Sequence, residues 1–278
     1  MKILKTICFV FCISLVLLFS GCISENADNQ KDQVSSEALL EKVLKRGTLK
    51  IGMSTFVPWA MKDKEGNLMG FEIDVARQLA KDLGVKAEFV PTKWSGIIPA
   101  LLTGKFDVII GGMGISPGRN LKVNFSIPYD YTGMSLVAHK KKAKGFQTLE
   151  DFNKTSVTIA ARIGTSAAAA AKKFMPKASL KLFDDESQAI QELLSNRVHA
   201  VIASAPLPAF QAIKYSDTLF IPFSGTFTKE PIGFALQKGD FDTMNYFNNW
   251  ITLKSAQGWL AERKAYWFET RDWADRIQ

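Results

Sequence analysis

The residues best able to do chemistry in this sequence are two hydroxyls at a helix start and an arginine in a turn. Gly164-Thr165-Ser166 precedes the run Ala167–Ala171, which predicts a helix with a hydroxyl N-cap. Free backbone N–H groups and the positive end of the helix dipole favour an anion there. The planar guanidinium of Arg119 matches a carboxylate through two parallel hydrogen bonds. Taken alone, Thr165 is explained by capping and Arg119 by a surface turn.

Nucleophilic, metal and phosphate chemistry lack the residues that they need. All three cysteines lie at the start of the chain, at Cys8, Cys12 and Cys22, so the body has no thiol for a disulfide, a metal or a nucleophile. Two histidines are too few for a histidine-rich metal site. Gly111-Gly112-Met113-Gly114 lacks the spacing and the lysine of a phosphate-binding loop. We expect no metal, no cofactor and no catalytic residue.

The elements that must hold the site alternate between short apolar runs and helical spacing. The runs predict strands at 49–53, 87–90, 106–113, 134–139, 157–162, 180–183, 200–204 and 232–236. Between them apolar residues recur at helical spacing, as at Ile73, Ala76, Leu79, Ala80 and Leu83. The alternation predicts α/β lobes with largely parallel sheets, which bind ligands beyond the carboxyl ends of their strands.

The N-terminus has the features of an exported lipoprotein. Residues 1–21 combine two lysines, an apolar core and a small-residue exit, which predicts a signal peptide rather than a buried helix or a membrane anchor. Leu18-Phe19-Ser20-Gly21-Cys22 resembles a bacterial lipobox, with Phe19 in place of the usual leucine, and predicts lipid attachment at Cys22. Residues 22–38 are predicted to form the lipidated N-terminus and a flexible tether, because 24–37 are polar and nearly free of bulky apolar groups. We expect the protein to be held on a bacterial membrane and to face the periplasm or the cell exterior.

Composition and charge narrow the class further. A chain of 278 residues that is 47% apolar is long enough for two compact lobes. The formal net charge of +8 is mild, and the basic residues are scattered. The longest basic run, His139-Lys140-Lys141-Lys142, lies between two apolar stretches and predicts a solvated connection. We expect no nucleic-acid partner.

Five motifs, in this order, resemble the bacterial extracellular solute-binding proteins of family 3, which serve polar amino-acid ABC importers. They are Arg46–Gly52, Gly66–Ala76, Trp94–Leu101, Arg119–Tyr129 and Glu230–Phe234. The resemblance extends from about Leu44 to about Phe268.

This resemblance implies the type II periplasmic-binding-protein fold, with two α/β lobes. The first lobe would comprise 39–138 and 232–278, and the second 143–226. The chain would cross between them near 138–142 and 228–232, and closure of this hinge would trap a ligand. The protein would be a monomer that delivers a small carboxylate-bearing solute, an amino acid or an analogue, to an importer permease.

The resemblance also implies the ligand-binding residues. Arg119 would clamp the ligand carboxylate together with backbone N–H groups at Thr165. Phe56 and Trp94 would sandwich the ligand side chain. Arg162 aligns with a basic residue that some relatives use, although a solvent-exposed strand end is an equally good interpretation. The full candidate set is Met53, Phe56, Trp94, Gly112, Gly114, Arg119, Arg162, Thr165, Ser166 and Ser204.

Three of these positions depart from the family pattern. Met53 replaces an acidic residue, Gly114 replaces a serine or threonine, and Ser204 replaces the aspartate that binds the ligand α-ammonium. A hydroxyl supplies no charge, so an enclosed ammonium would lose its main counter-ion. Glu230 or Asp184 could compensate, but the sequence does not locate them. We therefore expect a ligand with a carboxylate and an apolar or aromatic remainder, and weak binding of lysine, arginine and histidine.

Two other functions stay open on the same fold. Cyclohexadienyl dehydratases resemble this family, and Val90–Trp94 and Phe125–Tyr129 are similar to their segments. Those enzymes carry a glutamate proton donor just after the Gly-Thr of the second lobe, where this chain has Ser166-Ala167-Ala168. The fold also senses ligands for membrane receptors. Because a proton donor is missing there, we expect a binding protein and not an enzyme.

Overall fold

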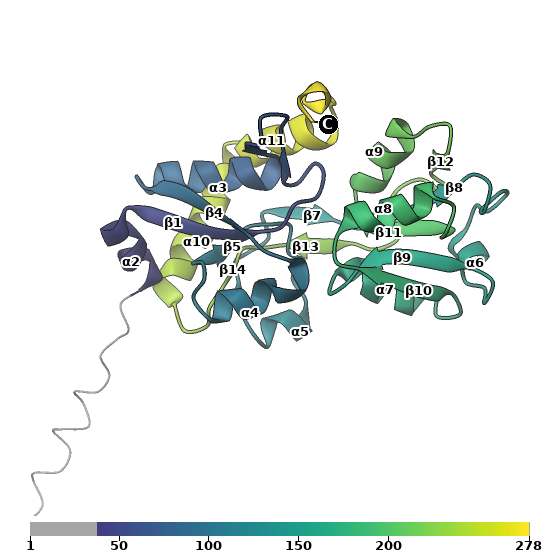
Figure 1. Cartoon of the computed structure of the whole chain (residues 1–278). Helices are drawn as coiled ribbons and strands as arrows, with labels where there is room; N and C mark the ends of the chain where they lie inside the picture. The colour runs from purple at the N-terminus through teal and green to yellow at the C-terminus, as the bar shows by residue number, and fades with distance from the viewer. Residues whose placement is uncertain (1–37, 278) are drawn as a thin grey trace, which may run out of the picture. The chain divides into compact units, whose positions relative to one another are not determined.

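The structure, a computed structural model, describes residues 38–277, which form two α/β lobes (Figure 1). This confirms the fold class predicted from the sequence. The expected signal peptide at 1–21, the expected lipid site at Cys22 and all but the last residue of the expected tether lie outside the described residues.

The first lobe is built on a five-stranded sheet with the strand order β4-β1-β5-β14-β6. β1 (Thr48–Met53) runs parallel to β4 (Lys86–Pro91) and to β5 (Val108–Ile109). β14 (Ala235–Leu236) runs antiparallel to β5 and to β6 (Asn124–Phe125). The sheet is therefore mixed, because a strand from the C-terminal part of the chain completes it.

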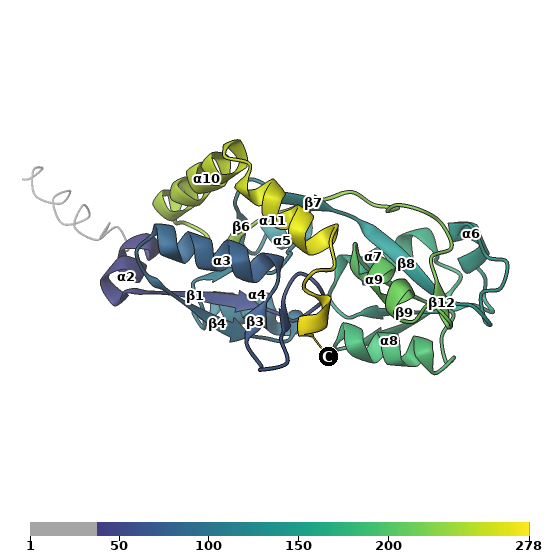
Figure 2. The ribbon, with the colours of Figure 1, turned by 90° about the horizontal axis from the view of Figure 1, so that it is seen from above.

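Helices cover this sheet through their apolar faces. The buried residues of α3 (Phe71–Asp82), among them Phe71, Val75 and Leu79, recur at helical spacing and enter the largest core cluster. α11 (Trp259–Phe268) lies beside α3 in two perpendicular views (Figures 1 and 2). The other elements of this lobe are α2 (Leu39–Arg46), the hairpin of β2 (Met61–Lys62) and β3 (Leu68–Met69), α4 (Ile97–Leu102), α5 (Pro117–Asn120), α10 (Phe241–Ala256) and two short 3₁₀ helices, η1 (Trp94–Gly96) and η2 (Ala274–Arg276).

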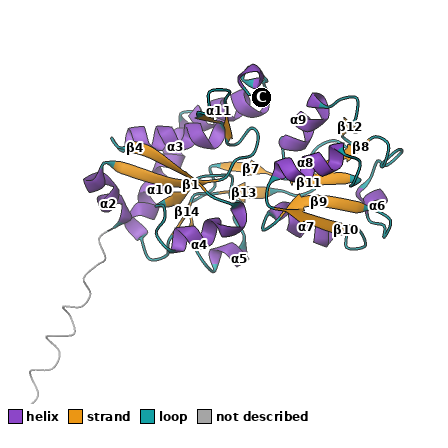
Figure 3. Ribbon diagram, viewed as in Figure 1, coloured by secondary structure: helices purple, strands orange, loops and turns teal. Residues whose placement is uncertain are grey.

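The second lobe repeats the plan with the strand order β10-β9-β11-β8-β12. β9 (Thr158–Arg162) runs parallel to β10 (Ser179–Phe183) and β11 (Ala200–Ser204). β8 (Met134–His139) runs antiparallel to β11 and to β12 (Leu219–Phe220). α7 (Ser166–Phe174) and α8 (Glu186–Leu194) pack on opposite faces of this sheet (Figure 3). Two further helices are α6 (Leu149–Phe152) and α9 (Leu207–Lys214).

Two antiparallel strands, β7 (Asp130–Thr132) and β13 (Glu230–Ile232), run side by side between the two sheets (Figure 1). The first of them differs from the crossing expected near 138–142. Ala138 pairs with Ala200 of β11 and with Phe220 of β12, so residues 134–138, expected in the first lobe, belong to the second sheet. Every residue of β8 is buried, and an apolar run of this kind fits the interior of either sheet equally well.

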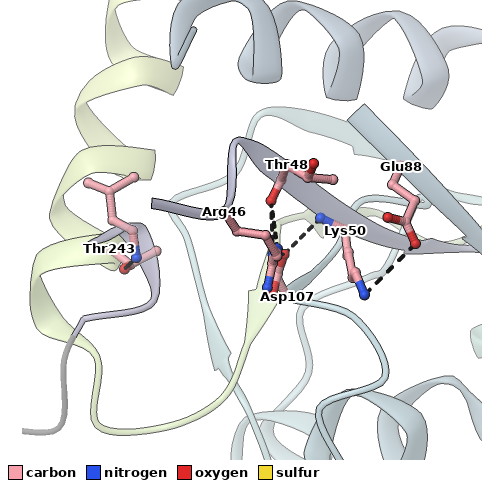
Figure 4. A network of polar contacts seen from close by, with 7 residues as sticks. Arg46, Thr48, Lys50, Glu88, Asp107 and Thr243 are labelled. Carbon is pink, nitrogen blue, oxygen red and sulfur yellow. Dashed lines mark hydrogen bonds and ion pairs between the residues drawn. The ribbon is translucent and has the colours of Figure 1, made fainter. Parts of the chain in front are cut away.

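A network of polar contacts connects the amino-terminal halves of neighbouring strands in the first sheet (Figure 4). Asp107, just before β5, accepts hydrogen bonds from the Lys50 backbone N–H at 2.7 Å and from the Arg46 guanidinium. Arg46 also donates to the Thr48 carbonyl at 2.8 Å, and the Lys50 ammonium lies 4.0 Å from the Glu88 carboxylate of β4. These contacts stabilise the sheet at the edge opposite to the carboxyl ends of its parallel strands.

Among the described residues, no helix combines the length and the apolar character needed to cross a membrane. Within the same range, no three His, Cys, Asp or Glu side chains are grouped as metal ligands.

Candidate functional site

The carboxyl ends of six strands converge on one small cavity. In the first lobe Phe56, Trp94 and Gly112 follow β1, β4 and β5, and in the second Arg162, Glu186 and Ser204 end or follow β9, β10 and β11. The cavity measures about 30 Å³ and is lined by Phe56, Trp94, Gly112, Gly114, Arg119, Arg162, Thr165, Ser166, Ala167, Glu186, Ser204 and Glu230. That is room for about two water molecules. The structure thus brings together all candidates except Met53.

Met53 lies away from the cavity. Its side chain is fully buried and packs in a small apolar cluster with Ala60 and Ile73. Successive side chains of β1 point to opposite faces of the sheet. Met53, the last residue of β1, points to the face that α3 covers. Met53, where the family has an acidic residue, therefore contributes to the core of the first lobe and not to the cavity lining.

Arg119 reaches from α5 into the cavity. Its Nη1 donates to the Gly114 carbonyl at 2.8 Å, and its Nη2 donates to the Gly164 carbonyl of the second lobe at 3.2 Å. Ser116 caps α5 by accepting from the Arg119 backbone N–H at 3.3 Å, which fixes the position of the side chain. Burial lowers the pKa of Arg119, and the Glu230 carboxylate opposes that shift. The guanidinium is a desolvated cation whose present acceptors are neutral carbonyls.

The start of α7 faces the same cavity. The Thr165 hydroxyl accepts from the Ala168 backbone N–H at 3.3 Å and donates to the Arg162 carbonyl at 2.6 Å. This confirms Thr165 as the N-cap. The first N–H groups of a helix have no acceptor within the helix, so those of Ser166 and Ala167 can meet an anion held by Arg119.

Glu230 supplies the acid that the sequence could not locate. It stands at the start of the crossing strand β13, and its Oε1 accepts from the Thr228 hydroxyl at 3.0 Å. A Cβ atom built on Gly114 would lie 3.0 Å from Glu230 Oε2 and 3.5 Å from Arg119 Nη1. Glu230 thus fills the space that the absent side chain of Gly114 leaves. Asp184, the other candidate, is instead an exposed partner of Lys93 at 2.8 Å.

Arg162 is buried in the cavity wall and not exposed at a strand end. Its guanidinium carbon lies 5.1 Å from the ring centre of Trp94 and 5.9 Å from that of Phe56. It forms an ion pair with Glu186, and its Nη2 donates to the Ser54 hydroxyl at 2.9 Å. Burial raises the pKa of Glu186, and the charge of Arg162 acts against that shift.

Sequence reasoning missed Glu186, the first residue of α8. It follows Asp184 and Asp185 in a run of three acids. Only its place after β10 distinguishes it from them, because the carboxyl end of a parallel strand points toward the site.

Polar contacts join the two lobes around the cavity. The indole N–H groups of Trp94 and Trp59 donate at 3.2 Å to the carbonyls of Gly164 and Ala205, respectively. Arg119 shares the Gly164 carbonyl with Trp94. A ligand larger than the cavity can therefore enter only when the lobes part.

Two larger hollows lie nearby, with volumes of about 650 and 620 Å³. The first borders Tyr131 of β7 and Thr228, which precedes β13, and the second borders Phe56 and Glu186. Neither gathers two guanidinium and two carboxylate groups, as the small cavity does. Convergent polar groups mark a binding site better than volume does.

The fold and the cavity define a class: two-lobe binding proteins that enclose a small solute between their lobes. The model of the bacterial extracellular solute-binding proteins, family 3, matches residues 49–270, and the chain belongs to this family.

Comparisons with individual proteins agree with this assignment. The L-cystine-binding protein TcyJ of Escherichia coli (strain K12) is 31% identical over 235 residues, covering 84% of this chain and 87% of TcyJ. The cyclohexadienyl dehydratase of Pseudomonas aeruginosa is 25% identical over 242 residues, covering 85% and 88%. The crystal structure of a putative ABC-transporter binding component from Wolinella succinogenes, complexed with lysine, is 40% identical, with a TM-score of 0.78 and coverage of 83% and 99%.

Proposed function

We propose that this protein captures an amino acid between its two lobes and delivers it to the permease of an ABC importer. Family membership and the names of the relatives support the class of function. The observation that carries the proposal is the convergence of Arg119, the start of α7 and Glu230 on one cavity. These are the groups that the two charged ends of an amino acid need.

The carboxylate of the ligand would replace two carbonyl acceptors of Arg119. A guanidinium binds a carboxylate more strongly than it binds a neutral oxygen, and the N–H groups of Ser166 and Ala167 add a second set of donors. The α-ammonium would lie at Glu230, whose carboxylate stands beside the place of the absent Gly114 side chain.

Delivery rests on movement about β7 and β13. A ligand that contacts Arg119 on one lobe and α7 on the other favours the state in which the lobes are together, and a permease can recognise that state. One chain supplies both lobes, so we infer that the protein acts as a monomer.

Export and anchoring belong to the same proposal. The lipobox-like sequence ending at Cys22 supports attachment of a lipid that holds the protein on a membrane. Cys22→Ser should give an exported protein that is released from membranes, as fractionation after a high-salt wash would show. A variant that stays with the membranes would contradict lipid attachment at this residue.

A dehydratase function has less support, although one relative is named for it. The start of α7 carries Ser166, Ala167 and Ala168 and no acid. Of the two acids of the cavity, Glu186 is paired with Arg162, and Glu230 lies on β13 at the proposed ammonium position and not at the start of α7. We infer that the protein is not an enzyme, and incubation with arogenate should leave that compound unchanged.

The proposal is tested by a thermal-shift screen of the purified protein against the twenty amino acids. A ligand that binds only the folded state raises the melting temperature as its concentration increases. At least one amino acid should do so, and matched carboxylic acids without the amino group should do so less. A melting temperature that no amino acid raises would contradict the proposal.

A further inference from the structure

Arg162 occupies the place between Phe56 and Trp94 where the family resemblance predicts the side chain of the ligand. Its guanidinium lies over the rings of both Phe56 and Trp94, at 5.9 and 5.1 Å from their centres. The residue is 2% exposed, so this cation is part of the cavity wall. Aromatic faces attract a cation, and here the chain itself provides that cation.

The acid that could pair with a cationic side chain of a ligand already has a partner. Glu186 pairs with Arg162, and both side chains line the cavity. With Arg119 and Glu230 the lining holds two positive and two negative groups. An amino acid with a neutral side chain keeps this balance, whereas lysine or arginine would add a positive charge beside Arg162 with no acid left for it.

One donor of Arg162 has no acceptor. Nη1 bonds to Glu186 and Nη2 bonds to Ser54, but Nε–H is buried and unpaired among the described residues. A buried donor without a partner costs free energy, which an acceptor atom on a ligand would recover.

We propose that Arg162 fills the aromatic sandwich as a built-in cation and thereby selects a neutral amino acid whose short side chain carries an acceptor oxygen. This inference rests on the proposed function. It departs from the Wolinella succinogenes relative, whose crystal structure holds lysine.

The first test uses the unaltered protein and three amino acids of similar size in titration calorimetry. Asparagine carries an acceptor oxygen, leucine has nearly the same shape without one, and 2,4-diaminobutyrate ends in a cation. Asparagine should bind about tenfold or more tightly than either of the others, because a hydrogen bond to a charged group is worth that much. Leucine or 2,4-diaminobutyrate binding as tightly as asparagine would overturn the inference while leaving the proposed function intact.

The second test does not need the natural ligand. Arg162→Ala should vacate the sandwich and leave Glu186 unpaired, so free guanidinium should bind there. At 10 mM, guanidinium chloride should raise the melting temperature of this variant by about 2 °C or more relative to sodium chloride. The same variant should gain affinity for arginine and lose its preference for asparagine over leucine.

Arg197→Ala is the matched control. Arg197 also pairs with a glutamate of α8, Glu192, but it is exposed and lies outside the cavity. Guanidinium should stabilise neither this variant nor the unaltered protein. If Arg162→Ala gains nothing from guanidinium, Arg162 is not a built-in occupant and the inference falls. If no amino acid binds the unaltered protein, the proposed function falls, and the guanidinium test still decides the role of Arg162.

Discussion

Arg119 is the residue whose loss should affect binding most. Its guanidinium is partly buried at the cavity, it belongs to none of the apolar core clusters of the described residues, and its two acceptors are backbone carbonyls. Arg119→Ala should therefore weaken amino-acid binding by about 2–5 kcal/mol, the usual loss when a buried charge pair is truncated. Titration calorimetry would measure the affinity, and circular dichroism would check that the variant is folded.

A suitable control for that variant is Arg197→Ala, because Arg197 is an exposed arginine outside the cavity. The control should keep the affinity of the unaltered protein. Unchanged affinity in Arg119→Ala as well would refute its role as the carboxylate clamp.

Glu230 should decide how strongly the ligand ammonium is held. Glu230→Gln keeps the shape and removes the charge, so affinity should fall about tenfold or more for amino acids. Adding Ser204→Asp to this variant should restore part of the affinity, since Ser204 lines the same cavity. Calorimetry on the two variants would test this, with Asp184→Asn, at a surface ion pair with Lys93, as the control. Equal affinity of Glu230→Gln and the parent would show that another group binds the ammonium.

The motif positions indicated most of the cavity lining, whereas its charge balance required the structure. Thr165 follows from local sequence, because a helix start fixes where its hydroxyl points, whereas Arg119 follows only from the family motif. Glu230 and Glu186 come from segments distant in sequence, and nothing in their neighbours separates them from surface acids. Met53 is predicted as a site residue but lies in the core. Successive side chains of a strand point to opposite faces of the sheet, and the sequence alone does not show which face Met53 takes until the register of the strand is known.

At the scale of elements, apolar runs indicated where strands lie better than where they end. The run at 106–113 gives a paired strand only at Val108–Ile109, although Ile110 and Met113 are buried too. The run at 232–236 divides into the last residue of β13 and the whole of β14, where the chain leaves the crossing strands for the first sheet. Apolar character reports burial, and pairing depends on the neighbouring strand. For the same reason the antiparallel strands that make both sheets mixed were not expected.

Gly133, which directly follows β7, should be essential to the crossing strands. A Cβ atom there would lie 2.0 Å from the Thr228 carbonyl oxygen and 2.6 Å from the Thr226 hydroxyl. Gly133→Ala should therefore force the two crossing segments apart and destabilise the protein by about 1–3 kcal/mol. Urea unfolding would measure this loss.

Gly118→Ala is the matched control, because a Cβ atom at Gly118 meets nothing within 4 Å. Next to Gly133, a chain of two hydrogen bonds connects the first crossing segment to the cavity. The Met134 backbone N–H donates to the Thr228 hydroxyl at 2.8 Å, and that hydroxyl donates to Glu230. Equal stability of the two alanine variants would show that the segment adapts without strain.

At the scale of the whole molecule, a buried acid should make stability depend on pH. Glu72 of α3 is fully buried, and its Oε2 accepts from the Tyr129 hydroxyl at 2.7 Å. Burial raises the pKa of Glu72 to about 8, the charge of Asp130 adds to the shift, and the hydrogen bond from Tyr129 opposes it. Between its ordinary pKa of 4.5 and 8 the folded protein holds a proton that the unfolded chain releases, so stability falls as the pH rises through this window.

Glu72→Gln should remove that part of the pH dependence. The pKa values of Asp130 and Glu186 are also raised by burial, so the informative quantity is the difference between the variant and the parent. From pH 5 to 8 the parent should lose on the order of 3 kcal/mol more stability than the variant. Urea unfolding at several pH values would measure this, with the exposed Glu65→Gln as the control. Parallel pH profiles for Glu72→Gln and the parent would contradict the prediction.

The central claim is that the cavity holds both charged ends of an amino acid, the carboxylate at Arg119 and α7 and the ammonium at Glu230. The most direct measurement is titration calorimetry of the unaltered protein with its best amino acid and two analogues, one without the α-amino group and one without the α-carboxylate. Each analogue should bind at least about tenfold more weakly, because each leaves a charged group of the cavity, Arg119 or Glu230, without its partner on the ligand. An analogue without the amino group that binds as tightly as the amino acid would contradict the claim.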